Sequence, residues 1–223
     1  MMTLGHSRLD EIPAKLRELP PSDILKVKLG ADQDLEILNA VLRADERPLF
    51  LDANQGWTTV AQALAAVDLV GRDRLAGLEQ PFAKDRFDLH KELMHQGVAR
   101  LFADESMQDL RDLERVSAAF SGVNIKLMKC GGLDRAVELI ERARELGLGV
   151  MLGSMSESSL GCGAMAQLGR FADLIDLDGP WLISNDPFTG LTLEDGRLAH
   201  EEVSGIGVRL RTEASLDWRP IGA

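Results

Sequence analysis

The stretch DILKVKLGADQDLEILNAVLRADERPLFLD, residues 23–52, reads as one complete strand–helix–strand unit. Apolar residues dominate 23–29 and 48–53, as they do in strands that are buried on both faces. Between them, residues 34–44 place apolar side chains at helical spacing. Two strands joined by a helix in this way are typical of a parallel sheet.

The same unit recurs along the chain. Candidate strands lie at 2–6, 23–29, 48–53, 75–80, 99–104, 122–128, 148–153 and 174–178. Helical patterns lie between them, for instance at 109–120 and at 135–147, where Gly147 closes the helix. Eight strands with seven helices predict an α/β fold, a TIM-like (β/α)7β barrel of parallel strands rather than an open sheet.

Composition limits the class of protein. A chain of 223 residues can form one large barrel or two small domains. The net charge of −11, without a basic stripe, argues against nucleic-acid binding. No apolar run is long enough to span a bilayer and no signal peptide is recognisable, so we expect no membrane partner. Cys130 and Cys162 suggest no disulfide framework, which fits the cytoplasm, and small apolar packing explains them better than a nucleophilic role.

Polar residues stand at the carboxyl ends of the predicted strands. They are Lys28, Asp52, Glu79, Asp104, Lys126, Ser154 and Asp178. Successive members are 22 to 28 residues apart, which is about one strand–helix unit. The carboxyl ends of barrel strands share one rim, where active sites are built. Helix capping explains any single carboxylate but explains the whole set, with its lysines, poorly.

Three of these carboxylates, Asp52, Glu79 and Asp104, follow adjacent strands and should converge. Carboxylates that crowd together repel one another unless a cation lies among them. All the donors are oxygens and the set contains no histidine or cysteine, so the sequence favours Mg²⁺, or Mn²⁺, over zinc. The alternative is a salt-bridge cluster with the nearby lysines.

Lys28 and Lys126 follow strands that are four places apart in an eight-stranded ring, so they should face each other across the mouth. One amine can then remove an α-proton from a carboxylate substrate while the other returns a proton to the opposite face, giving the epimer through an enediolate. We expect burial and neighbouring cations to lower their pKa values. Lys26 either adds positive charge beside the metal or only orients its ligands.

The motifs KVKLG, LDANQGW, LEQP, ADES, NIKLMKCGG and GSMSES resemble those of the enolase superfamily, in its muconate lactonizing enzyme subgroup. Lysine bases and Mg²⁺ are already known for that superfamily. The resemblance implies that Asp52, Glu79 and Asp104 bind Mg²⁺, that Lys28 and Lys126 form the acid–base pair, and that Lys26 assists at the substrate carboxylate.

Within the subgroup, LIDLDGPWL (174–182) places Asp176 and Asp178 in an Asp-x-Asp motif similar to that of dipeptide epimerases, which bind the substrate's free α-ammonium group there. The resemblance implies a dipeptide substrate such as L-Ala-D/L-Glu. Two carboxylates opposite the metal suit a cation; alternatively, Asp178 caps the following turn. Succinylbenzoate synthases, N-succinylamino acid racemases and muconate cycloisomerases share the ring without the ammonium site and are the alternative.

Further candidates for substrate contact are Ser154, Ser156 and Asn54. Trp57 either lines the pocket or stabilises its own loop. Glu105 and Lys129 adjoin motif residues, and we expect them to support those residues or to be solvated.

The expected domains are a barrel over 1–185 and a C-terminal segment over 186–223. In the family, the corresponding segment joins an N-terminal capping domain, whereas this sequence starts at the first predicted strand. The chain can therefore be a truncated piece, the partner of a separate cap or a shortened homologue. An epimerase is one interpretation; a lidless barrel that binds only a metal or a partner is the other. We expect a homo-oligomer.

Overall fold

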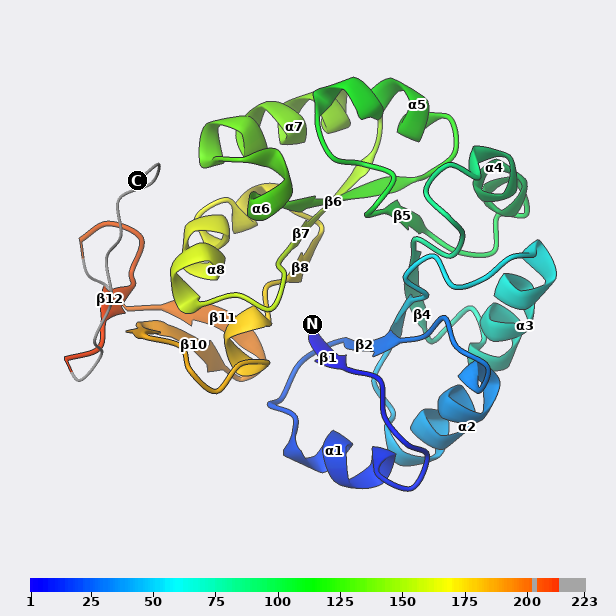
Figure 1. Ribbon diagram of the computed structural model, residues 1–223, viewed down its shortest axis with the longest axis horizontal. Coiled ribbons are helices and arrows are strands. Elements are labelled where there is room, and N and C mark those ends of the chain that lie inside the picture. The colour runs from blue at the N-terminus through cyan, green and yellow to red at the C-terminus, as the bar shows by residue number, and fades with distance from the viewer. Residues whose placement is uncertain (202–203, 213–223) are drawn as a thin grey trace, which may run out of the picture.

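The computed structural model describes residues 1–201 and 204–212. Eight parallel strands follow one another around a single sheet in sequence order, and helices surround them (Figure 1), which confirms the predicted TIM-like barrel. The strands are β1 (Met2–Leu4), β2 (Leu25–Lys28), β3 (Leu49–Asp52), β4 (Leu75–Glu79), β5 (Leu101–Ala103), β6 (Gly122–Lys126), β7 (Gly149–Gly153) and β8 (Leu174–Asp176).

The outer helices are α1 (Ile12–Glu18), α2 (Asp34–Ala44), α3 (Val60–Val70), α4 (Phe87–His95), α5 (Leu113–Ser117), α6 (Leu127–Cys130), α7 (Leu133–Glu145) and α8 (Ser159–Ala166). Short 3₁₀ turns are η1 (Leu110–Asp112), η2 (Gly169–Phe171) and η3 (Gly179–Trp181). In the part of the chain that the structure describes, no helix combines the length and the apolar character needed to cross a membrane.

Most predicted elements differ from the observed ones by a few residues at their ends, and three of the differences have a clear local cause. The strand expected at 122–128 ends at Lys126, because a helical turn begins at Leu127. The strand expected at 174–178 ends at Asp176. The helix expected over 109–120 is divided between η1 and α5, because Asp109 caps a separate first turn there.

The ring is joined between β8 and β1 by isolated hydrogen bonds instead of a ladder of paired residues. The amino group of Met1 donates to the carbonyl of Ile175 at 2.7 Å. The backbone N–H of Thr3 donates to Oδ2 of Asp178, also at 2.7 Å. A side chain thus completes the ring at the end that carries the predicted site.

The amino-terminal half of the barrel interior is apolar. Phe50, Phe102 and Met151 form a separate buried cluster there. Glycines make room for the rings: a Cβ at Gly122 would lie 2.5 Å from the ring of Phe102, and one at Gly77 would lie 2.7 Å from that of Phe50. This close-packed layer fills the lower part of the barrel interior, which leaves room for a ligand inside the ring at its carboxyl end.

The C-terminal segment forms short antiparallel pairs outside the barrel, β9 (Phe188–Thr189) with β12 (Arg209–Leu210) and β10 (Leu191–Glu194) with β11 (Arg197–His200). Figure 1 places this segment on the side of the barrel where α8 lies. The division at residue 185 stays a prediction, and residues 202–203 and 213–223 of the predicted segment lie outside the described residues.

Candidate active site

A cavity of about 320 Å³ opens at the carboxyl ends of the barrel strands. The predicted site residues that line it are Lys26, Lys28, Asn54, Asp104, Lys126, Ser154, Ser156, Asp176 and Asp178. Asp52 and Glu79 are fully buried and contact Lys26. The structure therefore brings together all the residues predicted for catalysis, metal binding and substrate binding.

Lys26 lies among three carboxylates. Strand alternation turns its side chain, like that of Lys28, to the barrel interior. Its Nζ lies 2.6 Å from Oε2 of Glu79, 2.6 Å from Oδ2 of Asp176 and 3.0 Å from Oδ2 of Asp52. Burial disfavours the ammonium, but these carboxylates outweigh it and hold the pKa of Lys26 well above its usual value. Lys26 is thus a fixed cation in the site.

Lys28 and Lys126 project from β2 and β6, which are four places apart in the eight-stranded ring. The Nζ of Lys28 lies 2.6 Å from Oδ2 of Asp52, and that of Lys126 lies 2.8 Å from Oδ2 of Asp104. Each amine therefore has its own carboxylate on its own side of the cavity.

The expected lowering of the lysine pKa is wrong for Lys126. Burial does act to lower it, but the charges of Asp104 and Glu79 outweigh burial and raise the pKa of Lys126. The residues that we expected to bind a metal are here the counter-ions of this amine.

The carboxylates do converge, because Asp52 and Asp104 both act on the pKa of Glu79. Burial, followed by the charge of Asp52, raises the pKa of Glu79 to about 8. Burial also opposes ionisation of Asp52 and Asp104, but neighbouring lysines hold the pKa of each below its usual value. Glu79 therefore has less compensating positive charge than its two neighbours.

The donor set suits a divalent ion, although ammonium groups now lie between the carboxylates. Among residues 1–201 and 204–212, no three acidic, histidine or cysteine side chains are already arranged around a metal position. Six carboxylates, however, face four lysines: Asp52, Glu79, Asp104, Glu105, Asp176 and Asp178 against Lys26, Lys28, Lys126 and Lys129. If all are ionised, two negative charges are uncompensated. Oxygen ligands and this excess charge fit Mg²⁺.

Asp176 and Asp178 reach the same cavity in different ways. Asp176 contacts Lys26, and within the described chain its buried Oδ1 has no hydrogen-bond partner. Asp178 accepts the Thr3 N–H, and the described turn after it, η3, receives no capping bond from its side chain. The capping alternative for Asp178 is therefore wrong. Burial and the nearby Asp176 raise the pKa of Asp178, so this end of the cavity favours a cation.

The smaller candidates also lie at the cavity. Asn54 adopts a positive φ of 44° and donates its backbone N–H to Oδ1 of Asp52 at 3.1 Å. The hydroxyl of Ser154 accepts the N–H of Gly179 at 3.3 Å, which ties the loop after β7 to that after β8. Ser156 is exposed at the rim.

Trp57 stabilises its loop and does not line this cavity. Its indole N–H donates to Oδ2 of the buried Asp34 at 2.6 Å, and Asp34 also accepts the N–H of Gly30. A Cβ at Gly30 would lie only 2.2 Å from the carbonyl oxygen of Ala53. The glycine in KVKLG therefore lets the loops after β2 and β3 pack together.

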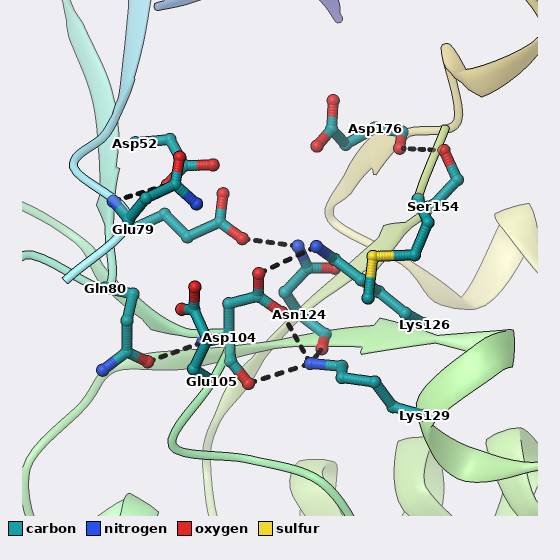
Figure 2. A network of polar contacts seen from close by, with 12 residues as sticks. Asp52, Glu79, Gln80, Asp104, Glu105, Asn124, Lys126, Lys129, Ser154 and Asp176 are labelled. Atoms are coloured by element: carbon teal, nitrogen blue, oxygen red, sulfur yellow. Dashed lines mark hydrogen bonds and ion pairs between the residues drawn. The ribbon is translucent and has the colours of Figure 1, made fainter. Parts of the chain in front are cut away.

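Two buried amides support the carboxylates, and the sequence analysis assigned them no role. Asn124 donates to Oε1 of Glu79 at 2.6 Å (Figure 2). The side-chain oxygen of Gln80 accepts the N–H groups of Asp104 and Ser106, both at 3.0 Å. Strand alternation could have found Asn124, two residues before Lys126. Gln80 has a positive φ of 36°, which the sequence does not reveal.

Glu105 is half-buried, and the side chain of Lys129 is buried. Burial and the charge of Asp104 raise the pKa of Glu105, whose buried Oε2 has no hydrogen-bond partner in the described part of the chain. Lys129 is buried and its Nζ lies 2.6 Å from Oδ1 of Asp104. The expectation that both support neighbouring motif residues fits Lys129 better than solvation does.

Residues 16–214 match the family described as enolase C-terminal domain-like. The chain belongs to this family. Among curated proteins, it is 38% identical over 207 residues to the L-Ala-D/L-Glu epimerase of Bacteroides thetaiotaomicron, a match that covers 92% of this chain and 54% of the relative.

Solved structures agree with this family. The dipeptide epimerase from Methylococcus capsulatus complexed with Mg ion superposes with a TM-score of 0.84 at 31% identity, covering 94% of this chain and 64% of that one. The N-succinyl Arg/Lys racemase from Bacillus cereus gives 0.82 at 26% identity, covering 94% and 59%. This member of the enolase C-terminal domain-like family thus spans less than two thirds of the length of these epimerases and racemases.

Proposed function

We propose that this chain is the catalytic barrel of an Mg²⁺-dependent isomerase, an epimerase that removes and returns the α-proton of the carboxyl-terminal residue of a dipeptide. The observation that carries the proposal is the placement of Lys28 and Lys126 on opposite strands of one ring, at one cavity, beside three buried carboxylates. A planar carbon intermediate between two such amines can be protonated on either face.

The roles follow from the contacts. One of Lys28 and Lys126 accepts the α-proton as a neutral amine, and the other donates a proton from its ammonium form to the opposite face. Lys26, held as a cation among carboxylates, contributes positive charge where the enediolate forms. Mg²⁺ bound by Asp52, Glu79 and Asp104 would supply Lewis-acid stabilisation of that negative charge.

The acidic end of the cavity favours a dipeptide over an acylated amino acid. Asp176 has an unpartnered buried oxygen among the described residues, and burial beside Asp176 raises the pKa of Asp178. A substrate ammonium group would pair with this excess negative charge. We assign the N-terminal residue of the substrate to this end and its carboxylate to the metal end.

Proton exchange tests the proposal directly. In D₂O with Mg²⁺, L-Ala-L-Glu and L-Ala-D-Glu should lose the α-proton signal of Glu by NMR, and EDTA should stop the loss. Lys28→Met and Lys126→Met should each slow exchange of one epimer by about 10²–10⁴-fold, and the two variants should affect opposite epimers.

The exposed Lys91 on α4 provides a matched control, because Lys91→Met should exchange both epimers at the wild-type rate. Absence of exchange from folded, Mg²⁺-loaded protein would contradict the proposal. So would equal effects of both lysine variants on both epimers.

N-acyl amino acids are the second candidate substrates. Oδ2 of Asp178 already accepts the Thr3 N–H, which leaves the acidic pair fewer free oxygens for an ammonium group. Offering N-succinyl-L-glutamate beside the dipeptides distinguishes the two classes. Faster exchange of the dipeptides supports the ammonium assignment, whereas exchange of N-succinyl-glutamate alone replaces it with racemisation of N-acyl amino acids.

We also propose that a segment outside this sequence covers the mouth. Met128, Met155 and Leu182 follow β6, β7 and β8 and are 66%, 42% and 44% exposed. Large exposed apolar side chains near a cavity mouth favour a contact with another segment. A longer form of the chain, or a separate capping chain, should raise the exchange rate by excluding water. Light scattering would measure the homo-oligomer that we predict.

A further inference from the structure

Two ammonium groups hold the Asp104 carboxylate, and only one belongs to the proposed acid–base pair. Lys126 contacts Oδ2 at 2.8 Å, and Lys129 contacts Oδ1 at 2.6 Å. Figure 2 shows both lysines reaching this carboxylate, with Lys129 extending from α6. The role of the second lysine is not explained by proton transfer to a substrate.

Among the described residues, Lys129 has only oxygen atoms as hydrogen-bond partners, although burial outweighs the charge of Asp104 and lowers the pKa of this lysine. Its side chain is 7% exposed. Besides Oδ1 of Asp104, its Nζ donates to the backbone carbonyls of Asp104 at 2.9 Å, Met107 at 3.0 Å and Asn124 at 3.0 Å. An ammonium group has three donors and no acceptor, so a shell made only of oxygens satisfies it completely. The contacts connect the loop after β5 to strand β6.

The local backbone explains why two lysines reach one carboxylate. Lys126 ends β6, and α6 starts at the next residue. One helical turn then separates Lys126 from Lys129, and side chains about three residues apart return to the same side. Lys126 reaches Asp104 from the end of β6, and Lys129 reaches it from α6.

We propose that Lys129 is a positioning residue for proton transfer by Lys126, and that it acts through Asp104. By holding Oδ1, it prevents the carboxylate from rotating, so that Oδ2 remains on the cavity side, where it locates Lys126 and would also be available to the proposed Mg²⁺. This inference rests on the proposed epimerase function.

The lysines on the opposite side of the cavity contact their carboxylate differently, so the proposed role of Lys129 concerns Lys126 and not Lys28. Lys28 is held by Oδ2 of Asp52, and Lys26 contacts that same oxygen. The lysines on that side therefore share one oxygen, whereas Lys126 and Lys129 divide the two oxygens of Asp104. Loss of Lys129 should consequently impair one face of the reaction more than the other.

The test compares exchange of the two epimers at saturating Mg²⁺. Lys28→Met and Lys126→Met first identify which epimer each lysine serves. Lys129→Met, which keeps an unbranched side chain one atom shorter and removes its charge, should then slow exchange of the Lys126-dependent epimer by about 10- to 100-fold, the usual effect of losing such a supporting contact. The Lys28-dependent epimer should change much less, and Lys91→Met should change neither.

Three results would overturn the inference. Equal slowing of both epimers, with a lower melting temperature, would assign Lys129 a merely structural role. Wild-type exchange by Lys129→Met would exclude any positioning role while leaving the epimerase proposal intact. Absence of exchange in the folded wild type would remove the proposed function and this inference together. If Lys129→Met does not fold, Lys129→Gln, which keeps N–H donors, takes its place.

Discussion

The two halves of the barrel interior are filled by different kinds of side chain, apolar in one half and charged in the other. At the amino end, Phe50, Phe102 and Met151 pack against glycines, and dispersion and the hydrophobic effect suffice there. At the carboxyl end, lysines and carboxylates alternate within hydrogen-bonding distance. The apolar half is stable by itself, whereas the charged half is stable only while each charge has a partner. This difference predicts how each half responds to substitution.

The largest effect should come from removing the central cation of the charged half. Lys26→Met leaves Asp52, Glu79 and Asp176 buried without the ammonium that contacts all three, which should lower the free energy of unfolding by about 3–5 kcal/mol. Urea unfolding in EDTA measures it. Mg²⁺ should restore part of the loss, because a divalent ion can replace the missing charge.

Lys91→Met is the control for this prediction, since exposed substitutions stay within about 0.5 kcal/mol. A Lys26→Met protein as stable as the wild type in EDTA would mean that the charged half does not depend on its internal pairing.

The next effect concerns the buried His90, whose ring lies 3.3 Å from the side-chain nitrogen of Gln80. It is measured as a change in the free energy of unfolding with pH. His90 is buried against Phe82 and Phe120, and burial lowers its pKa to about 4. Between that value and the ordinary value of 6.5, the unfolded chain binds a proton that the folded protein does not. The free energy of unfolding should therefore fall by up to about 3 kcal/mol as the pH drops from 6.5 to 4.

The matched variants are His90→Gln, which should lose this part of the pH dependence, and His95→Gln on the exposed side of the same helix, which should keep it. Unfolding by urea at pH 6.5 and pH 4.5 gives the comparison. An unchanged pH dependence in His90→Gln would assign the acid sensitivity to the carboxylates of the site instead.

The smallest effect should come from overfilling the apolar half. Gly122→Ala places a methyl group against the ring of Phe102 and should lower the free energy of unfolding by about 1–3 kcal/mol. Combining it with Phe102→Leu should recover part of that loss, because leucine lacks the ring atoms. Gly5→Ala, where a Cβ meets no atom within 4 Å, should be nearly neutral. Additive losses in the double variant would refute the close-packing explanation.

Sequence reasoning succeeded where periodicity carries the information. The period of strand and helix predicted the barrel, and the fold is confirmed by the ring of eight strands in sequence order. Strand ends were less accurate, as at 122–128 and 174–178, because hydrophobicity continues from a buried strand into the turn that follows. The residues predicted for the site lie at one cavity, and they could be selected because one polar residue per unit is conspicuous among apolar strands.

Contacts between side chains of different strand–helix units were not predicted from the sequence. From the sequence, Lys129 could either support neighbouring motif residues or be solvated, and the structure shows that it contacts the loop after β5 and strand β6. The pKa of Lys126 moved in the opposite direction from our expectation, because the balance between burial and the charges of Asp104 and Glu79 depends on distances. Trp57 likewise donates a hydrogen bond to Asp34 and does not line the cavity.

The sequence by itself determined which side chains reach the rim, because strand alternation and the repeating unit depend only on local order along the chain. The tertiary structure alone decided which charges pair: Lys26 with three carboxylates, and Lys129 with Asp104. Pairing energies change steeply with separation and burial, and both are set by the closure of the barrel rather than by any neighbour in sequence.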